Sequence, residues 1–330
     1  MSMHLNPINP LGFILGAYYL LGQKIDRARR STNANYAKYP TICVGNFQSG
    51  GTGKTPATIW VAKQLKALGY SPIILIRGYK GSVKKSAIID CNDPYTYGDE
   101  AMLHTQHFPT VVGKNRRESA QLASTITGDK KVLVMDDGLQ HYELFKDFSI
   151  VCQKSHRFEL DHMLPIGRLR EIPHTKIDVI LSQINDARYH PVKSWKGIPE
   201  YTFERITTLV SGSKEKGLVI CGVANPDDCV YQIQKAGGFV EDEMKFRDHH
   251  RYSVADLARI EKASKKYDYR VHCTAKDAVK LAPLVKAENS PVKLSVWDVK
   301  IQPVGDVQPL LDVMVAKIEE VFENRTNKQV

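Results

Sequence analysis

The chain lacks the cysteine spacing of a disulfide framework or a structural zinc site. Its 330 residues contain six cysteines, and no two of them form a Cys-x-x-Cys pair. Several of these cysteines lie in apolar segments that predict buried strands, so we expect reduced thiols in a reducing compartment. The sequence also has no low-complexity tract and no convincing internal repeat, which argues against fibrous and repeat architectures.

An apolar run long enough to span a bilayer is missing as well, since such a run takes about 20 residues. Residues 11–21 form a shorter apolar stretch, and basic residues follow it at Lys24, Arg27, Arg29 and Arg30. Because these charges come after the apolar stretch and no clear cleavage site appears, a secretory signal is not expected. A helix over residues 11–30 predicts instead a membrane-associated segment on an anionic lipid surface. The alternative is a helix docked on the protein's own core.

Recognised nucleic-acid modules are also missing, although the chain is basic. It carries a formal net charge of +10, from 46 Lys+Arg against 36 Asp+Glu. A basic balance favours an anionic partner, but neither paired zinc ligands nor an aromatic RNP pattern occurs. We therefore expect no nucleic-acid partner. The anionic partner is an acidic lipid surface or a phosphorylated substrate, unless the charge only keeps the protein soluble.

The most informative segment that is present runs Gln48-Ser49-Gly50-Gly51-Thr52-Gly53-Lys54-Thr55. It follows an apolar run at residues 41–44 and precedes a helical pattern that begins at Pro56. Glycines let backbone N–H groups close around phosphate oxygens, and a helix start adds unpaired N–H groups and a positive dipole end. We expect Lys54 to contact the β- and γ-phosphates and Thr55 to ligate Mg²⁺. Gln48 stands where the strict P-loop pattern has glycine, and a glycine-rich turn without a ligand is the alternative.

A pair of carboxylates supplies the matching metal site. Asp136 and Asp137 directly follow residues 132–135, which predict a buried strand. In the Walker B arrangement a parallel strand delivers a carboxylate beside the P-loop, where it holds Mg²⁺ directly or through water. The alternative is an aspartate pair that caps a loop.

The order of predicted elements indicates an α/β fold of the P-loop NTPase type. Strands are predicted at residues 41–44, 73–76, 110–112, 132–135, 148–151 and 179–182, with helical patterns between several of them. This alternation predicts a parallel sheet covered by helices on both faces, with ligands at the carboxyl ends of the strands. The glycine-rich segment, Asp136 and the loop that starts at Arg77 should therefore share one edge.

A second, smaller α/β unit is predicted to follow. It contains strands at residues 217–221 and 269–273 and a helix at 254–265. Residues 201–205 and 294–299 are expected to pair as a two-stranded hinge, and a last helix at 310–324 to return to the first unit. The predicted division is a membrane-associated helix (1–35), a P-loop domain (36–205), a second α/β domain (206–300) and a returning C-terminal segment (301–330).

Several short motifs, taken in order, resemble those of one known family. They are Val44-Gly45-Asn46, the glycine-rich segment with Pro56, Arg77-Gly78-Tyr79, Gly98-Asp99-Glu100, Asp136-Asp137-Gly138-Leu139-Gln140-His141, Leu164-Pro165 with Gly167, Leu169-Arg170-Glu171, Gly222-Val223-Ala224-Asn225-Pro226, Asp248-His249-His250-Arg251-Tyr252 and Lys276-Asp277-Ala278-Val279. Together they resemble the tetraacyldisaccharide 4'-kinases of lipid A biosynthesis. The resemblance implies transfer of the γ-phosphate of ATP, with Mg²⁺, to the 4'-hydroxyl of a tetraacylated glucosamine disaccharide 1-phosphate. It also implies action at the cytoplasmic face of the bacterial inner membrane.

The same resemblance implies roles for individual residues. ATP is expected at residues 48–55, and Mg²⁺ at Thr55, Asp136 and Asp137. The catalytic group is expected to include Lys54 and the carboxylate of Asp99, paired with His249 or His250. Substrate contacts are expected from Arg77, Gln140 and Arg170. From the residues alone, the favoured interpretations are a helix N-cap for Asp99 and a surface turn for the two histidines. The resemblance favours a site completed when the two units close on each other.

Competing functions make different demands on the sequence. A regulatory GTPase requires an Asn-Lys-x-Asp guanine reader, which the chain lacks. A membrane-associated P-loop ATPase of partitioning or regulatory type would hydrolyse ATP without a phosphorylated lipid product. A soluble small-molecule kinase would leave the apolar residues 11–21 unexplained.

Overall fold

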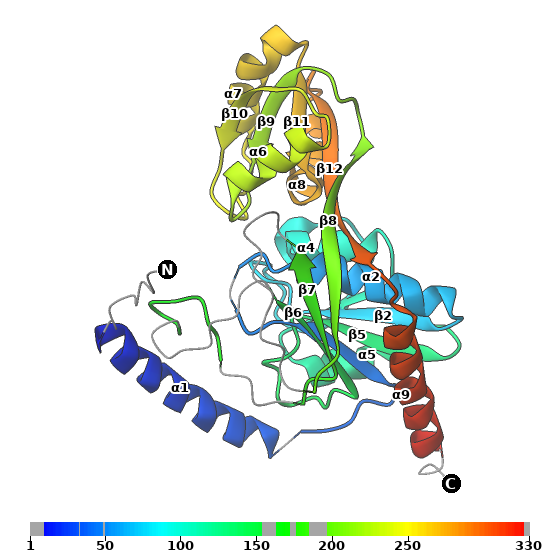
Figure 1. The fold of residues 1–330 in the computed structure, drawn as a ribbon. Helices are drawn as coiled ribbons and strands as arrows, with labels where there is room; N and C mark the ends of the chain where they lie inside the picture. Colours follow the sequence, from blue (N-terminus) through cyan, green and yellow to red (C-terminus); the bar gives the residue numbers. More distant parts are fainter. Residues whose placement is uncertain are drawn as a thin grey trace.

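The computed structural model describes residues 10–32, 34–48, 50–153, 163–171, 176–184 and 197–326. Two α/β units lie one above the other, and two long strands run between them (Figure 1). These strands are β8 (Glu200–Ser211) and β12 (Lys293–Val304), which pair antiparallel from Thr202↔Val304 to Ser211↔Val296. The two predicted segments do belong to a pair of strands, but in another register than expected: residues 202–205 pair with 301–304, and residues 296–299 pair with 207–211.

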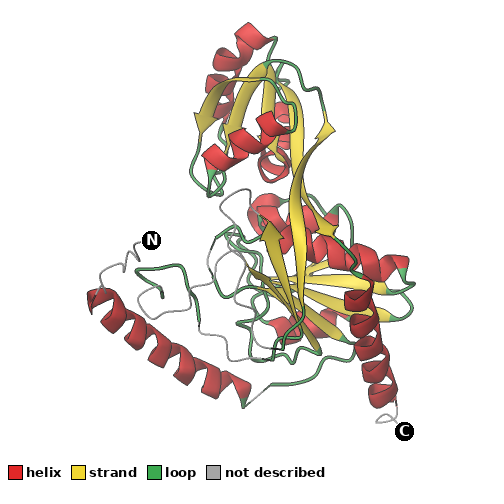
Figure 2. Cartoon of the chain, in the orientation of Figure 1, coloured by secondary structure: helices red, strands yellow, loops and turns green. Residues whose placement is uncertain are grey.

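One continuous sheet passes through both units (Figure 2). Its twelve strands follow the order β10-β9-β11-β12-β8-β7-β6-β1-β5-β2-β4-β3. The pairs are parallel except β8 with β12 and β3 with β4. The remaining strands are β1 (Thr41–Gly45), β2 (Ser71–Ile76), β3 (Ala87–Ile88), β4 (Thr110–Val112), β5 (Lys131–Asp136), β6 (Phe148–Gln153), β7 (Val179–Ile184), β9 (Gly217–Cys221), β10 (Val240–Lys245) and β11 (Arg270–Thr274). The predicted α/β fold with a largely parallel sheet is therefore confirmed.

Helices alternate with these strands, and side-chain caps fix several of their starts. They are α1 (Pro10–Ser31), α2 (Lys54–Ala67), α3 (Pro94–Tyr97), α4 (Asp99–Thr105), α5 (Arg116–Ala123), α6 (Pro226–Lys235), α7 (Val254–Ser264), α8 (Ala275–Ala287) and α9 (Gln308–Thr326). Ser253 and Asp256 form a reciprocal capping box on α7, and Thr274 caps α8. Two expectations need correction: α2 begins at Lys54 rather than Pro56, and Asp99 is the first residue of α4 rather than its N-cap, which is Gly98.

Alternation along the strands of the first unit produces two apolar layers. Ile42 and Val44 of β1 face a core shared with α2 and α9, whereas Cys43 faces a second core shared with α5. Successive side chains of a strand point to opposite faces, so a sheet covered on both sides needs apolar residues at every position. This explains why β1, β2, β5 and β6 appear in the sequence as short, nearly continuous apolar runs.

The second unit repeats this arrangement around β9 and β11. Leu218 and Ile220 pack with α7 and α8, while Val219 packs with α6 and the buried Trp297. A further apolar cluster joins the two units, because it includes Met102 and Leu103 of α4 together with Val279 of α8. The units are thus packed against each other near the carboxyl ends of their strands.

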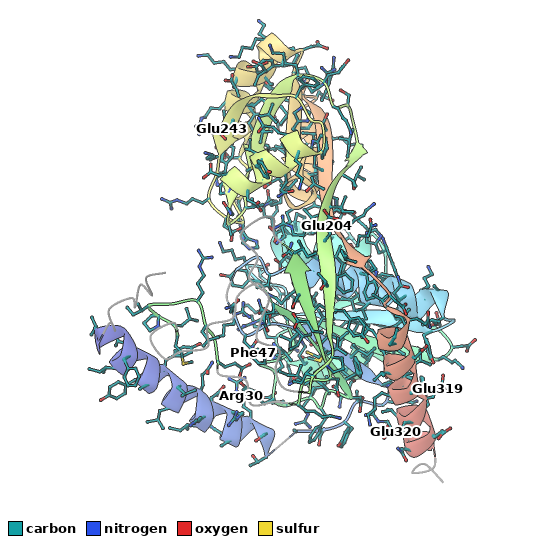
Figure 3. The ribbon with its side chains drawn as sticks, viewed as in Figure 1. Arg30, Phe47, Glu204, Glu243, Glu319 and Glu320 are labelled. Atoms are coloured by element: carbon teal, nitrogen blue, oxygen red, sulfur yellow. The ribbon has the colours of Figure 1, made fainter. Side chains whose placement is uncertain are left out.

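The C-terminal helix α9 returns to the first unit, as predicted. Leu310, Met314 and Ile318 are buried in the core that α2 covers. Polar contacts at the helix surface add to this packing: Tyr70 donates to Glu319 at 2.5 Å, and Arg325 pairs with Asp147 at 2.6 Å. Figure 3 shows Glu319 and Glu320 on α9, beside the lower part of the first unit.

The N-terminal helix α1 has two different faces. Tyr19 and Leu20 pack against the core of the first unit, and Gln23 donates a hydrogen bond to the carbonyl of Arg170. On the other side the side chains of Leu11, Ile14, Tyr18, Leu21 and Ile25 are between 52% and 71% exposed. In the part of the chain that the structure describes, no helix is both long enough and apolar enough to cross a bilayer.

The packing of α9 can be tested with two neighbouring substitutions. Met314 is 0% exposed and Val313 is 54% exposed, although the two residues are adjacent on the helix. We expect Met314→Ala to lower the free energy of unfolding by about 2–5 kcal/mol because it leaves a cavity in the core. Val313→Ala should change it by less than about 0.5 kcal/mol. Urea unfolding of both variants measures the difference, and equal losses would contradict the described docking of α9.

Candidate active site

The glycine-rich segment lies at the carboxyl edge of the sheet, between the end of β1 and the start of α2. Gly50 and Gly53 have φ values of 101° and 81°, which L-residues rarely adopt. Asn46 donates to the Thr52 hydroxyl at 2.5 Å and fixes the loop from within. Gln48 forms a bridge with Leu169, which places residues 163–171 beside the loop. The predicted contact at Ser49 lies outside the described residues.

The predicted metal ligands Thr55 and Asp136 are brought together by the parallel pairing of β1 with β5. The Thr55 hydroxyl donates to Asp136 Oδ2 at 3.1 Å, and His104 Nε2 lies 2.7 Å from the same oxygen. Burial by itself raises the pKa of Asp136, but the hydrogen bond and charge of His104 and the charge of Lys54 outweigh it and lower the pKa. Asp136 is therefore ionised at neutral pH.

The other oxygen of Asp136 provides a test of the metal expectation. Asp136 is 2% exposed, and its Oδ1 is buried without a hydrogen-bond partner. An unpaired buried carboxylate oxygen is costly unless something else satisfies it. Among the described residues, no group of three or more His, Cys, Asp or Glu side chains is placed to hold a metal ion. The unpaired oxygen of Asp136, on a carboxylate that also contacts the Thr55 hydroxyl, fits Mg²⁺, which binds through one or two carboxylates while substrate phosphates and water complete its shell.

Asp137 is oriented differently from Asp136. It follows β5 with φ at 53°, and its carboxylate lies 3.7 Å from Lys54 Nζ. Arg170 donates from one guanidinium nitrogen to both Asp137 oxygens at 2.9 Å. The predicted nucleotide-binding lysine and the predicted substrate arginine therefore converge on one carboxylate.

The other predicted substrate residues have separate positions. Gln140 donates to the carbonyl of Asn46 at 3.0 Å and to Glu171 at 2.7 Å, which ties the loop after β5 to the glycine-rich segment. Arg77 directly follows β2 and is exposed at the same edge of the sheet. Gln140 therefore supports the loop in this structure, whereas Arg77 is accessible to a ligand.

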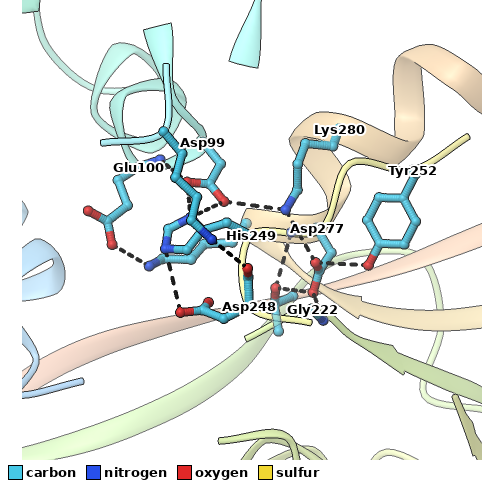
Figure 4. Close-up of polar contacts among 11 residues, drawn as sticks. Asp99, Glu100, Gly222, Asp248, His249, Tyr252, Asp277 and Lys280 are labelled. Atoms are coloured by element: carbon cyan, nitrogen blue, oxygen red, sulfur yellow. Dashed lines mark hydrogen bonds and ion pairs between the residues drawn. The ribbon is translucent and has the colours of Figure 1, made fainter. Parts of the chain in front are cut away.

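A second polar cluster forms where the two units meet (Figure 4). His249 Nδ1 lies 2.8 Å and 2.9 Å from the two oxygens of Asp99. Close backbone packing makes this contact possible: a Cβ on Gly98 would lie 2.7 Å from the carbonyl oxygen of Tyr79. The Tyr79 ring in turn meets the His249 ring edge-on at a centroid distance of 5.3 Å. The loop after β2, the start of α4 and the loop after β10 thus converge.

Asp99 is held as an anion although it is only 4% exposed. Burial alone would raise its pKa, but the hydrogen bond and charge of His249 and the nearby charge of Lys280 outweigh burial and lower the pKa to about 2. Its Oδ1 also accepts from the N–H of Glu100 at 2.9 Å. A carboxylate with so low a pKa does not retain a proton near neutral pH.

The structure distinguishes between the two candidate histidines. His250 Nε2 lies 3.0 Å from Asp256 Oδ2, at the start of α7, and does not contact Asp99. His249 is the histidine placed beside Asp99, and its φ of 58° turns the chain at that point. The sequence left this choice open because adjacent histidines cannot be separated without the backbone conformation.

Three buried residues near these clusters were not anticipated. His104 contacts Asp136, Arg116 donates to the carbonyl of Asp136 at 3.4 Å, and Lys280 lies 3.3 Å from Asp99. Each partner lies on a distant element of the chain, so no local spacing in the sequence indicates the contact. The sequence signal for such a residue is a charged or polar side chain at a position where the helical pattern predicts a buried apolar one.

Comparison with known proteins gives a consistent result. A family model described as tetraacyldisaccharide-1-P 4'-kinase matches residues 8–319. A tetraacyldisaccharide 4'-kinase of Rhizobium meliloti (strain 1021) is 31% identical over 287 residues, which cover 83% of this chain and 80% of the relative. A protein of the same name from Paramagnetospirillum magneticum is 30% identical over 300 residues, covering 88% and 90%.

A solved structure shares the fold. The crystal structure of the "apo" form of LpxK from Aquifex aeolicus in complex with ATP superposes with a TM-score of 0.71 at 20% identity. The match covers 92% of this chain and 97% of that one. The two-unit arrangement is therefore found in a crystal structure.

The glycine-rich loop can be tested with a matched pair of glycines. Gly53 and Gly69 both have positive φ values, 81° and 88°, and a Cβ at either position meets nothing closer than 3.8 Å. Alanine should therefore cost a similar strain at both positions, about 1–2 kcal/mol. Only Gly53→Ala should also weaken binding of a non-hydrolysable ATP analogue, by about tenfold or more, because a backbone that relaxes away from positive φ turns the loop N–H groups away from the phosphates. Calorimetric titration compares the two variants, and equal affinities would remove the phosphate role of the loop.

Proposed function

The chain belongs to the tetraacyldisaccharide-1-P 4'-kinase family, and on that premise we propose which residues perform each part of the reaction. The protein is an ATP-dependent kinase of lipid A biosynthesis, which transfers the γ-phosphate of ATP to the 4'-hydroxyl of a tetraacylated glucosamine disaccharide 1-phosphate. One observation supports the assignment of residues most strongly. The Asp99–His249 pair, built from both units, lies at the end of the sheet that also carries the phosphate loop.

The triphosphate is held by the glycine-rich segment and Lys54. Backbone N–H groups of residues 50–55 and the start of α2 face the phosphates, and the Lys54 ammonium neutralises their charge. Thr55 and Asp136 would hold Mg²⁺, which when bound offsets charge on the β- and γ-phosphates. The Asp137 carboxylate positions Lys54 by pairing with its ammonium group, and Arg170 holds the same carboxylate in place.

Proton removal from the acceptor hydroxyl is assigned to His249. With Nδ1 donating to ionised Asp99, Nε2 carries the lone pair. It accepts the proton of the 4'-hydroxyl once the substrate displaces the Asp248 carboxylate, which lies 3.6 Å from Nε2. The O4'–Pγ bond then forms while the bond from Pγ to the β,γ-bridging oxygen breaks, and ADP leaves with that oxygen. Asp99 stabilises the resulting imidazolium. The carboxylate expected to be catalytic thus acts by orienting and charging its histidine partner.

The contact between the units has a further consequence for the reaction. Asp99 belongs to α4 of the first unit and His249 to the second, so the pair exists only while the units are packed together. A site completed in this way keeps water from the γ-phosphate and limits wasteful hydrolysis. A partitioning or regulatory ATPase, the main alternative, has no use for such a pair. Incubation of the protein with labelled ATP and a lipid disaccharide monophosphate, followed by mass analysis, separates the two functions.

We propose that α1 brings the enzyme to its substrate at the cytoplasmic face of the bacterial inner membrane. The exposed residues Leu11, Ile14, Tyr18, Leu21 and Ile25 recur every three or four positions and so form one apolar stripe. Such a stripe, with basic residues at the C-terminal end of the helix, suits a helix lying in an anionic lipid interface. An acylated disaccharide leaves the bilayer poorly, because each buried CH₂ contributes about 0.8 kcal/mol.

If His249 is the base, substitutions of His249 and of the adjacent His250 should have different effects on kcat. His249→Ala should lower kcat by about 10²–10⁴-fold, since it removes the base and the partner of Asp99. His250→Ala removes a contact at the start of α7, so it should lower thermal stability slightly and leave kcat within a few-fold of the unmodified enzyme. Steady-state phosphorylation of the lipid substrate measures both. Similar losses of kcat in the two variants would contradict the assignment.

If α1 binds the membrane, substitutions in its apolar stripe should weaken binding to vesicles, whereas substitutions of exposed apolar residues elsewhere should not. Replacing Ile14, Tyr18 and Leu21 with serine should reduce binding to vesicles containing anionic phosphatidylglycerol by about tenfold or more. A control variant changes Tyr231 and Phe239, which are also exposed but lie in the second unit. Sedimentation with the vesicles compares them, and unchanged binding of the α1 variant would exclude the stripe as the anchor.

A further inference from the structure

Lys280 is a buried cation between two carboxylates, one from each unit. It lies on α8 and is 4% exposed, with its Nζ 3.3 Å from Asp99 Oδ2 and 3.7 Å from Asp277 Oδ1. Figure 4 shows it reaching from α8 toward both groups. A buried ammonium group is costly unless it is paired, so its position has to be explained by what it contacts.

Asp277 is held in place independently of Lys280. Its Oδ2 accepts from the N–H of Gly222 at 3.1 Å and from the Thr274 hydroxyl at 2.8 Å, and its Oδ1 accepts from the Tyr252 hydroxyl at 2.9 Å. Lys280 Nζ also lies 5.6 Å from the centre of the Tyr252 ring, within range of a cation–π contact. Asp277 and Tyr252 of the second unit thus hold the ammonium group of Lys280 in a position from which it contacts Asp99.

The charged groups around Asp99 come from four segments of the chain. They are Glu100 on α4, Lys80 in the loop after β2, Asp248 and His249 in the loop after β10, and Lys276, Asp277 and Lys280 on α8. Lys276 is paired with Glu100 at 2.5 Å, and Lys80 donates to the carbonyl of Asp248 at 3.0 Å. Among the lysines of the described structure, Lys280 is therefore the one in direct contact with the Asp99 carboxylate.

We propose that Lys280 is a positioning residue for phosphoryl transfer, which holds the Asp99 carboxylate in the orientation that aligns His249. The proposal rests on the function assigned above to the Asp99–His249 pair. Asp99 Oδ2 accepts a hydrogen bond from Lys280 Nζ, and Oδ1 accepts one from the N–H of Glu100. Rotation of the carboxylate is therefore restrained at both oxygens. Asp99 is thereby fixed before the substrate arrives, and reorganisation during the reaction is reduced.

The charge of Lys280 has a defined effect on titration. A cation next to Asp99 and His249 disfavours binding of a proton to either group. Removing that cation should therefore raise the apparent pKa of the pair and move the acidic limb of the rate profile to higher pH. A residue that only packed the two units together would leave this limb in place.

The test uses the full-length enzyme with three substitutions. Lys280→Met keeps the length of the side chain and removes its charge, Lys280→Arg keeps the charge, and Lys286→Met is a control at an exposed position of the same helix. We expect Lys280→Met to lower kcat by about tenfold to a hundredfold and to shift the acidic limb of kcat upward by about one pH unit. Lys280→Arg should keep the limb close to its original pH, and Lys286→Met should change neither quantity.

A double variant tests whether Lys280 acts through Asp99. In an Asp99→Asn background, adding Lys280→Met should lower the remaining kcat very little, because the interaction is already lost. Asp277 retains three hydrogen bonds without Lys280, so thermal unfolding should show a folded second unit. An unshifted acidic limb in folded Lys280→Met, or full additivity in the double variant, would overturn the proposal. If Asp99→Asn alone kept normal turnover, the proposed function of the pair would fail instead.

Discussion

A bound triphosphate has to be matched by positive charge at one place, and the parallel direction of the strands makes that arrangement available. The loop after β1, the end of β5 and the loop after β2 all lie at the same edge because their strands run the same way. The glycine-rich segment, Asp136 and Arg77 therefore meet without any loop crossing the sheet. An antiparallel order would place alternate loops at opposite edges. The apolar layers on both faces of the sheet fix this arrangement, because a one-residue shift in register would move each side chain into the opposite layer, where its packing partners differ.

Burial of charge is the main cost of this design, and the structure offsets it locally. Asp136, Asp99 and Asp277 are all nearly inaccessible, and each is surrounded by donors or cations. The first lies beside the phosphate loop, whereas the other two lie where the units meet. Buried ion pairs contribute little net stability but are sensitive to geometry. Their value here lies in orientation: each carboxylate is fixed in direction before ATP and the lipid bind.

The fold was largely predictable from the sequence, because its signals are local. Short apolar runs, helix caps such as Asn225 and Ser253, and the glycine-rich turn each depend on neighbouring residues. That β8 and β12 pair could be anticipated as well, since two strand-like segments flank the second unit, but the direction and register of the pairing were not predicted. The exact first residue of α4 could not be predicted, because an aspartate such as Asp99 suits both a helix terminus and a loop.

Only part of the site could be predicted, because the sequence does not indicate contacts between residues that lie far apart along the chain. The phosphate loop and Asp136 are recognisable by type and order, whereas the choice of His249 over His250 depends on the backbone conformation of the loop after β10. Lys280 and His104 contact carboxylates 181 and 32 residues away, and nothing near them in sequence indicates those partners. Long-range polar contacts of this kind depend on how packed elements meet, which periodicity does not encode.

A chain of contacts also connects the N-terminal helix to the phosphate site. Gln23 of α1 donates to the carbonyl of Arg170, and the N–H of Arg170 donates to the carbonyl of Phe47 at 2.6 Å, just before the glycine-rich segment. The Arg170 guanidinium meanwhile holds Asp137, which faces Lys54. The apolar stripe of α1 lies on the side of the helix away from these contacts. A helix fixed in this way sets the orientation of the catalytic edge relative to whatever surface the stripe contacts. If the acceptor stays in a lipid layer, as proposed above, such an orientation determines whether the sugar hydroxyl can reach the γ-phosphate at all.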